Sequence, residues 1–121
     1  MVGTNDLNKS ITYYDTLLNL LNLKRVDTSE EYAGYAPKNN PDNIEFYVTK
    51  PVNKKDANFG NGTQISFITQ SKGIVDKFYQ VGIELGGKSE GAPGERPEGS
   101  KVYYSYVRDL DGNKICAFTN L

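Results

Sequence analysis

The stretch Asp109-Leu110-Asp111-Gly112-Asn113-Lys114-Ile115-Cys116 decides the fold near the end of the chain. Asp111-Gly112 is a turn dipeptide, because glycine adopts backbone angles that other residues avoid. Runs rich in β-branched and aromatic residues lie on either side, at 102–107 and 115–119. This stretch therefore predicts a β-hairpin.

Two amphipathic helices are predicted upstream of the hairpin. Over residues 6–22, apolar residues recur at spacings of three and four and so share one helical face. They are Leu7, Ile11, Tyr14, Leu17, Leu18 and Leu21. Asn5 or Asp6 can cap the first amides of this helix. The second helix is predicted over 72–85, with Ser71 as its cap and Gly86-Gly87 as its end.

Period-two alternation predicts strands at 44–49 and 63–69. Ile44, Phe46 and Val48 share one face of the former, and Ile65 and Phe67 share one face of the latter. Residues 86–101 are rich in glycine, proline and charge, so we expect a long loop with little structure of its own. The order strand, helix, strands occurs twice, joining near residues 54–60. It predicts an α+β domain with an antiparallel sheet.

The amino-acid composition limits the classes of partner and location that we expect for this protein. The 121 residues include 14 basic and 15 acidic ones, with no basic block, so we expect no nucleic-acid partner. No apolar run approaches the ~20 residues that span a membrane. A single cysteine, Cys116, excludes an internal disulfide and favours a cytoplasmic location. Nine tyrosines suit either a pocket or interface with a wet side, or half-buried sheet positions.

Three segments together resemble a known family: Gly3-Thr4-Asn5-Asp6-Leu7 with the helix after it, Gly60-Asn61-Gly62-Thr63, and 108–115. They are similar to the vicinal oxygen chelate superfamily of glyoxalase I, bleomycin resistance proteins and extradiol dioxygenases. The resemblance covers nearly the whole chain. It implies an α+β fold of two βαβββ modules, about 1–55 and 56–121 of a single domain. Their curved, mostly antiparallel sheet would form a partial barrel around a pocket, with outer helices, in a homodimer.

The family usually holds a divalent metal with histidine, and this chain contains no histidine. The resemblance places the first ligand, commonly histidine, two residues before Met1, so we expect native residues to precede Met1. The second position is Glu45, which the glyoxalase I branch also has. The third is Gln64 in place of histidine, and the fourth is Cys116 in place of glutamate. Because a neutral amide is a poor ligand for zinc, nickel or iron, we expect no metal cofactor.

We expect six residues to line the ligand pocket: Glu45, Tyr47, Gln64, Tyr104, Tyr106 and Cys116. The 86–101 loop would lie at the pocket mouth. These residues also have structural interpretations. Glu45 could be an exposed residue at the rim of a strand, and Gln64 could hydrogen-bond to a neighbouring strand. The tyrosines could form ordinary cross-strand pairs. Cys116 is interpreted as a small buried group, because we expect Arg108 and Lys114 to point outward around the turn. This lining suits an uncharged or cationic organic ligand.

The first functional hypothesis is a glyoxalase/bleomycin resistance-like protein that binds a small organic molecule without the usual metal. The alternative is an enzyme of the glyoxalase I (lactoylglutathione lyase) type. It would depend on metal through residues before Met1, or work without metal with Glu45 as base. A third hypothesis is a purely structural or interaction module. The resemblance alone does not choose among them, because fold does not fix function.

Overall fold

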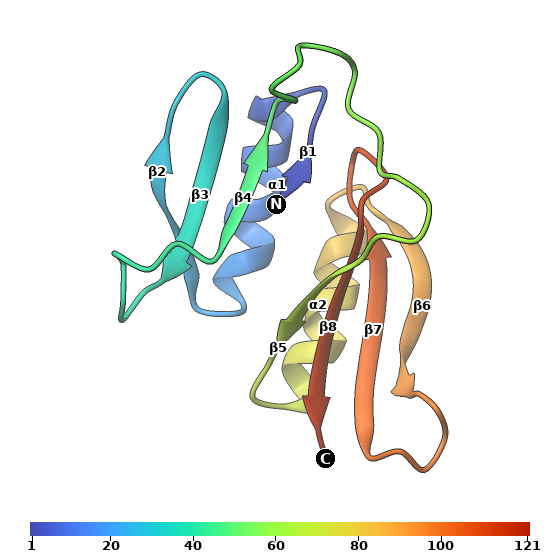
Figure 1. Cartoon of the computed structure of the whole chain (residues 1–121). Helices are drawn as coiled ribbons and strands as arrows, with labels where there is room; N and C mark the ends of the chain where they lie inside the picture. The colour runs from blue at the N-terminus through green and yellow to red at the C-terminus, as the bar shows by residue number, and fades with distance from the viewer. The chain divides into compact units, whose positions relative to one another are not determined.

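The computed structural model describes every residue from Met1 to Leu121. The chain divides into two compact units, Met1–Phe59 and Gly60–Leu121. Both follow the order strand, helix, three strands (Figure 1). The spatial strand order is β1-β4-β3-β2 in the first unit and β5-β8-β7-β6 in the second. In each sheet the first pairing is parallel and the other two are antiparallel. The predicted α+β fold of two βαβββ modules is therefore confirmed, with sheets that are curved but not closed into a barrel.

The first unit consists of β1 (Val2–Gly3), α1 (Leu7–Asn19), β2 (Leu23–Thr28), β3 (Tyr32–Pro37) and β4 (Phe46–Thr49). Of the two predicted caps, Asn5 and Asp6, the observed one is Asp6, whose side chain accepts a hydrogen bond from the Lys9 amide at 3.2 Å. Leu7, Tyr14, Leu17 and Leu18 of the predicted stripe are buried, and Tyr13 is buried with them although it lies outside the stripe. The helix ends before residue 22, because Asn22 takes a positive φ of 58° where the chain turns into β2.

A polar network joins α1 to the sheet of the first unit. Tyr35 on β3 is fully buried, and its hydroxyl donates to Asp15 Oδ1 at 2.9 Å. Arg25 on β2 donates from Nε and Nη2 to the two oxygens of the same carboxylate, both at 3.0 Å. Asp15 thereby satisfies a buried phenol that would otherwise lack a partner.

The second unit consists of β5 (Ile65–Ile68), α2 (Lys72–Glu84), β6 (Lys88–Glu95), β7 (Val102–Arg108) and β8 (Lys114–Asn120). Ser71 caps α2 as predicted, since its Oγ accepts from the Ile74 amide at 3.3 Å. Val75 and Phe78 of α2 are fully buried, and the Ser105 hydroxyl of β7 donates to the Val75 carbonyl at 3.1 Å. Neither α1 nor α2 has the length and apolar character that crossing a membrane requires.

The hairpin turn between β7 and β8 is organised by a buried carboxylate. Asp109 Oδ1 accepts from the amides of Asp111 and Asn113, each at 2.9 Å. Its Oδ2 accepts from the Asn113 side-chain amide, also at 2.9 Å. Gly112 takes the positive φ of 86° that the turn requires. The predicted hairpin is confirmed, and its turn is held by side-chain bonds as well as by backbone conformation.

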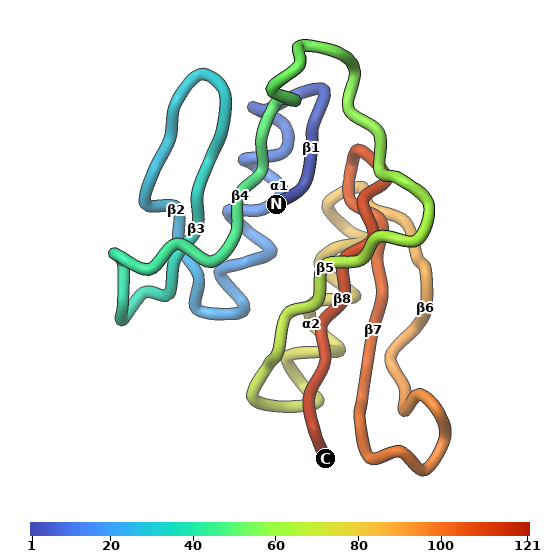
Figure 2. Tube along the Cα trace, in the orientation of Figure 1, coloured from blue at the N-terminus to red at the C-terminus, as the bar shows by residue number.

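The prediction of a loop over 86–101 is wrong. Half of it is strand β6, which pairs with β7 at the edge of the sheet and leads into a short turn (Figure 2). The register slips between Ser89 and Gly91 and again between Gly91 and Gly94, so the strand is bulged twice. Edge position and bulges are where sheets tolerate glycine and proline, including Pro93. The composition of residues 86–101 is therefore similar to that of a loop although half of the segment is a strand.

Candidate functional site

The candidate site is the side of the second sheet opposite α2, which we call the helix-free face. Successive strand residues point to opposite faces, so the residues that alternate with the buried Ser105, Ile115 and Ala117 lie on it. Tyr106 and Cys116 are register partners on β7 and β8, and Cys116 also pairs with Ser66 on β5. The residues on this face include Ser66, Tyr104, Tyr106, Cys116 and Phe118.

Three aromatic rings form a continuous strip on the helix-free face. The rings of Tyr104 and Tyr106 are stacked at 5.8 Å between centroids, with only 10° between their planes. Phe118 stacks on Tyr104 from the neighbouring strand at 5.7 Å and 27°. All three are half-buried, so part of each ring is open to contact. We refer to Tyr106, Tyr104 and Phe118 as the aromatic strip.

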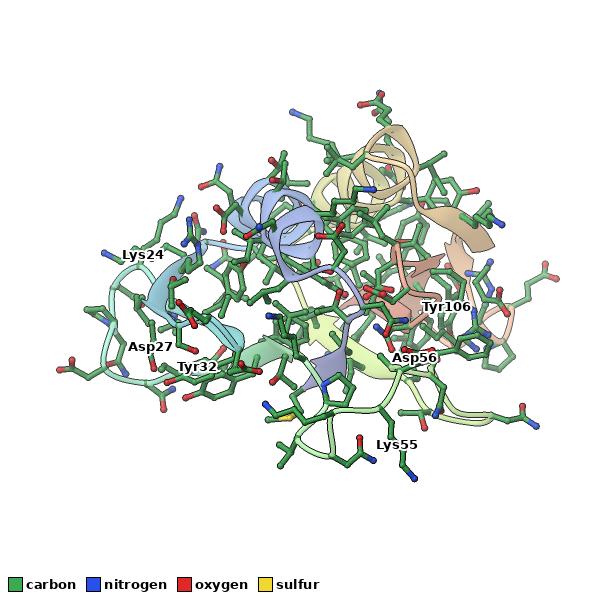
Figure 3. All side chains as sticks on the ribbon, turned by 90° about the horizontal axis from the view of Figure 1, so that it is seen from above. Lys24, Asp27, Tyr32, Lys55, Asp56 and Tyr106 are labelled. Carbon is green, nitrogen blue, oxygen red and sulfur yellow. The ribbon has the colours of Figure 1, made fainter.

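Two cations lie over the same ring of the strip. The Arg96 guanidinium carbon and the Lys114 ammonium nitrogen are each 5.1 Å from the Tyr106 ring centroid, within the range of cation–π attraction (Figure 3 labels Tyr106). The expectation that Lys114 points outward is wrong, because Lys114 is two residues from Cys116 on a strand and so shares its face. Arg108 instead pairs with Glu90 at 3.1 Å and donates to the Gly112 carbonyl at 3.0 Å.

Cys116 is fully buried beneath these groups. Burial raises the pKa of its thiol to about 11, although the Ser66 hydroxyl and the charges of Lys114 and Arg96 pull it down. The thiol is therefore protonated at neutral pH and is a poor nucleophile. Burial likewise raises the pKa of Tyr106, so its phenol stays neutral and can donate a hydrogen bond.

Gln64 lies at the entry to β5 and is exposed. Its side-chain nitrogen donates to the Ser66 hydroxyl at 2.8 Å, beside the position of Cys116 on β8. One N–H of the Gln64 amide is thus bonded to a residue of β5. The amide oxygen and the second N–H have the chemistry to orient a ligand.

Glu45 and Tyr47 belong to the first unit and lie on the side of its sheet opposite α1. The Tyr47 ring meets Tyr32 edge to face at 5.7 Å, and the Tyr32 hydroxyl donates to Asp27 at 3.3 Å (Figure 3). Glu45 is exposed and accepts a hydrogen bond from the Asn43 side chain at 3.3 Å. General bases are usually tuned by burial or by neighbouring charge, so these surroundings do not favour that role for Glu45.

Three contributors to the helix-free face were missed by the sequence reasoning. Lys114 and Phe118 each lie two residues from Cys116, so the alternation that placed the cysteine also identifies both. No alternation identifies Arg96, because it follows β6, whose composition is similar to that of a loop. Its position depends on tertiary contacts with carbonyl groups of β6 and β7.

A separate hollow of about 440 Å³ lies in the first unit, between the start of α1, the β2–β3 turn and the end of β4. Its lining includes the acidic Asp6 and Glu30 and the basic Lys50. The Asp6 carboxylate caps α1 and lies 3.9 Å from the Lys9 ammonium, and the charges of Glu30 and Lys50 offset one another. The hollow therefore shows no preference for a ligand charge.

Two βαβββ units whose sheets expose polar and aromatic side chains define a paired-module α+β protein. The model of the Glyoxalase/Bleomycin resistance protein/Dioxygenase superfamily matches residues 1–117. The chain therefore belongs to this superfamily. No curated protein matches it.

Solved structures agree with this assignment. A glyoxalase/bleomycin resistance protein from Albidiferax ferrireducens T118 is 38% identical, with a TM-score of 0.88 over 100% of this chain and 95% of that chain. A glyoxalase-related enzyme from Fulvimarina pelagi is 18% identical, with a TM-score of 0.75 over 98% and 84%. The fosfomycin resistance protein FosX from Listeria monocytogenes is 16% identical, with a TM-score of 0.68 over 99% and 88%. The last two support the fold alone.

The divalent metal that the superfamily implies does not fit the residues present. Gln64 offers a neutral amide, and the Cys116 thiol is fully buried and donates to the Ala117 carbonyl at 3.6 Å. No three His, Cys, Asp or Glu side chains gather where they could hold a metal ion. Zinc, nickel and iron need imidazole, thiolate or carboxylate ligands, which this set does not supply together.

Proposed function

We propose that this protein binds a small organic molecule on the helix-free face of its second sheet, without the divalent metal common in its superfamily. The observation behind the proposal is the aromatic strip with two cations over Tyr106. Apolar rings with a few polar groups beside them are the usual lining of small-molecule sites. Among its structural neighbours, one is named as a glyoxalase/bleomycin resistance protein and another as a fosfomycin resistance protein.

The binding proposal is tested by screening small aromatic and aliphatic compounds against the ¹⁵N-labelled full chain. Compounds that bind here shift the amide signals of β7 and β8, and Tyr106→Ala abolishes those shifts. Tyr103→Ala is the matched control, because that ring lies on the α2 side of the same strand and donates to Asp76 at 2.7 Å. Hits that survive Tyr106→Ala would place the site elsewhere, and a screen without any shift on β7 and β8 would refute the proposal.

We extend the proposed ligand-binding set to Glu45, Tyr47 and Gln64 on the basis of the superfamily resemblance. Glu45→Ala and Gln64→Ala are expected to weaken the binding of the same hits. Hits that bind equally well to both variants would confine the site to the aromatic strip and its two cations.

The metal-free proposal is tested by elemental analysis of protein purified without added metal. We expect zinc, nickel and iron far below one equivalent per chain. A double variant, Gln64→His with Cys116→Glu, should raise metal affinity, because imidazole and carboxylate replace the amide and the thiol. Near-stoichiometric metal in the wild-type protein would overturn this part of the proposal.

We also propose a homodimer in the cytosol. Each open sheet has edge strands, and sheet edges are surfaces at which chains associate. The cytosolic location is supported by the single, buried, free cysteine, which fits a reducing compartment.

A further inference from the structure

We infer that the helix-free face selects aromatic carboxylates, with the ligand ring on the aromatic strip and its carboxylate held by Arg96 and Lys114. This inference rests on the proposed function and adds the chemical class of the ligand. It replaces the uncharged or cationic ligand that the sequence suggested.

Arg96 is held in place by backbone groups and not by an acidic side chain. Its Nη1 donates to the carbonyls of Tyr104 at 3.1 Å and Gly94 at 3.4 Å, and its Nη2 donates to the Ala92 carbonyl. The bulges of β6 explain this arrangement, because they release carbonyls from the strand ladder. The remaining N–H groups on Nε and Nη2 have the fork geometry that matches a carboxylate. The guanidinium is therefore preorganised for an anion.

Lys114 adds a second positive charge without a carboxylate partner. Its ammonium lies over Tyr106, and no acidic oxygen lies within ion-pair distance of it or of Arg96. The neighbouring Arg108 differs, because Glu90 neutralises it at 3.1 Å. Two cations that form no ion pair lie next to one ring, so they attract an anion and repel a cationic ligand.

Other acidic groups near β6 are already engaged. The Glu95 carboxylate accepts from the backbone amides of Gly99 at 3.0 Å and Lys101 at 3.4 Å, in the turn that follows β6. Glu90 is paired with Arg108, and its charge also attracts Lys114. Three cations, Arg96, Lys114 and Arg108, thus stand against the carboxylates of Glu90 and Glu95. The local charge around Tyr106 is therefore positive.

The aromatic strip explains why the anion should carry a ring. From Tyr106 through Tyr104 to Phe118 the centroids are 5.8 and 5.7 Å apart, a length suited to one or two fused rings. Stacked and offset ring contacts add to the burial of apolar area. A small inorganic anion would reach the cations but would gain nothing from Tyr104 or Phe118.

The test compares two probes of the same shape, the anionic 2-naphthoate and the neutral 2-naphthamide, by NMR titration of the ¹⁵N-labelled full chain. We expect naphthoate to bind roughly tenfold more tightly, as for one charge-assisted hydrogen bond at a half-exposed site. Raising the salt concentration should weaken naphthoate and leave naphthamide unchanged. Lys114→Met should remove most of the preference for naphthoate. Lys72→Met is the matched control, because Lys72 lies 4.7 Å over Tyr103 on the other side of β7 and should leave the preference intact.

Arg96→Lys separates charge from geometry, because it keeps the positive charge and loses the fork. We expect it to weaken naphthoate more than naphthamide. Equal affinities of the two probes, both lost in Tyr106→Ala, would overturn the charge selection and leave the proposed function standing. Displacement of naphthoate by an equal concentration of inorganic phosphate would overturn the aromatic part. If neither probe shifts β7 or β8 although other screened compounds do, the inference fails and the binding proposal survives.

Discussion

Gly91→Ala should distort the candidate site through a single methyl group. Gly91 on β6 is the register partner of Tyr106 on β7. A Cβ at this position would lie 2.9 Å from Tyr106 Cδ2 and 3.2 Å from Arg96 Nη2, where ordinary contacts begin at 3.4 Å. The ring must therefore move by about 0.5 Å. Cδ2 is close to the backbone and Arg96 is bonded to backbone carbonyls, so neither group yields freely.

Overpacking of this kind costs about 1–3 kcal/mol. Replacing glycine by alanine also reduces the freedom of the unfolded chain, which offsets about 0.4–1 kcal/mol. We therefore expect a net loss of about 1–2 kcal/mol, measured by urea unfolding with far-UV circular dichroism. Naphthoate affinity should fall as well, because both of its proposed contacts are displaced.

Gly94→Ala is the matched control on the same strand. No atom lies within 4 Å of a Cβ built there, so this variant should be neutral or slightly stabilised. Equal unfolding midpoints for the two variants would refute the reasoning, since they would show that Tyr106 and Arg96 are not held against Gly91.

Three further outcomes are expected. Burial raises the pKa of Cys116 from 9.0 to about 11, so the thiol of the unfolded chain ionises first as the pH rises. The free energy of unfolding should therefore fall by roughly 3 kcal/mol as the pH rises from 9.0 to about 11. Cys116→Ala should lack that part of the decline in urea titrations, and an identical pH dependence would contradict it. Asp15→Ala should lower the free energy of unfolding by about 2 kcal/mol, because it leaves the buried Tyr35 hydroxyl without its acceptor. Tyr35→Phe should lower it by only about 1 kcal/mol. A smaller loss for Asp15→Ala than for Tyr35→Phe would disprove the role of the network. Light scattering at micromolar concentration should give the mass of a dimer, and a monomer mass would end that proposal.

Local signals in the sequence were sufficient for much of the fold. The apolar spacing and the caps Asp6 and Ser71 specify both helices, because each depends on residues within one or two turns. The hairpin was equally readable, since Asp109 and Gly112 act within the turn itself. Strand β6 was not, because its glycines and Pro93 serve bulges that exist only against β7.

The candidate site was readable in part for the same reason. Alternation placed Tyr104, Tyr106 and Cys116 on one face, and the register on β7 and β8 brings them together. The resemblance drew attention to metal positions and away from Lys114, which the same alternation identifies. Arg96 could not be found, because its contacts come from the bulged edge strand.

The strand order of the second sheet has a consequence for synthesis on the ribosome. β8 lies between β5 and β7, so the strand made last in this unit holds the first and third together. Until residues 114–120 emerge, β5 has no partner in its sheet and the β6–β7 hairpin has an uncovered edge. The first unit meets the same requirement much earlier, when β4 is complete at Thr49. The two units should thus fold in sequence, and a nascent chain stalled before residue 114 would present unpaired strands to chaperones.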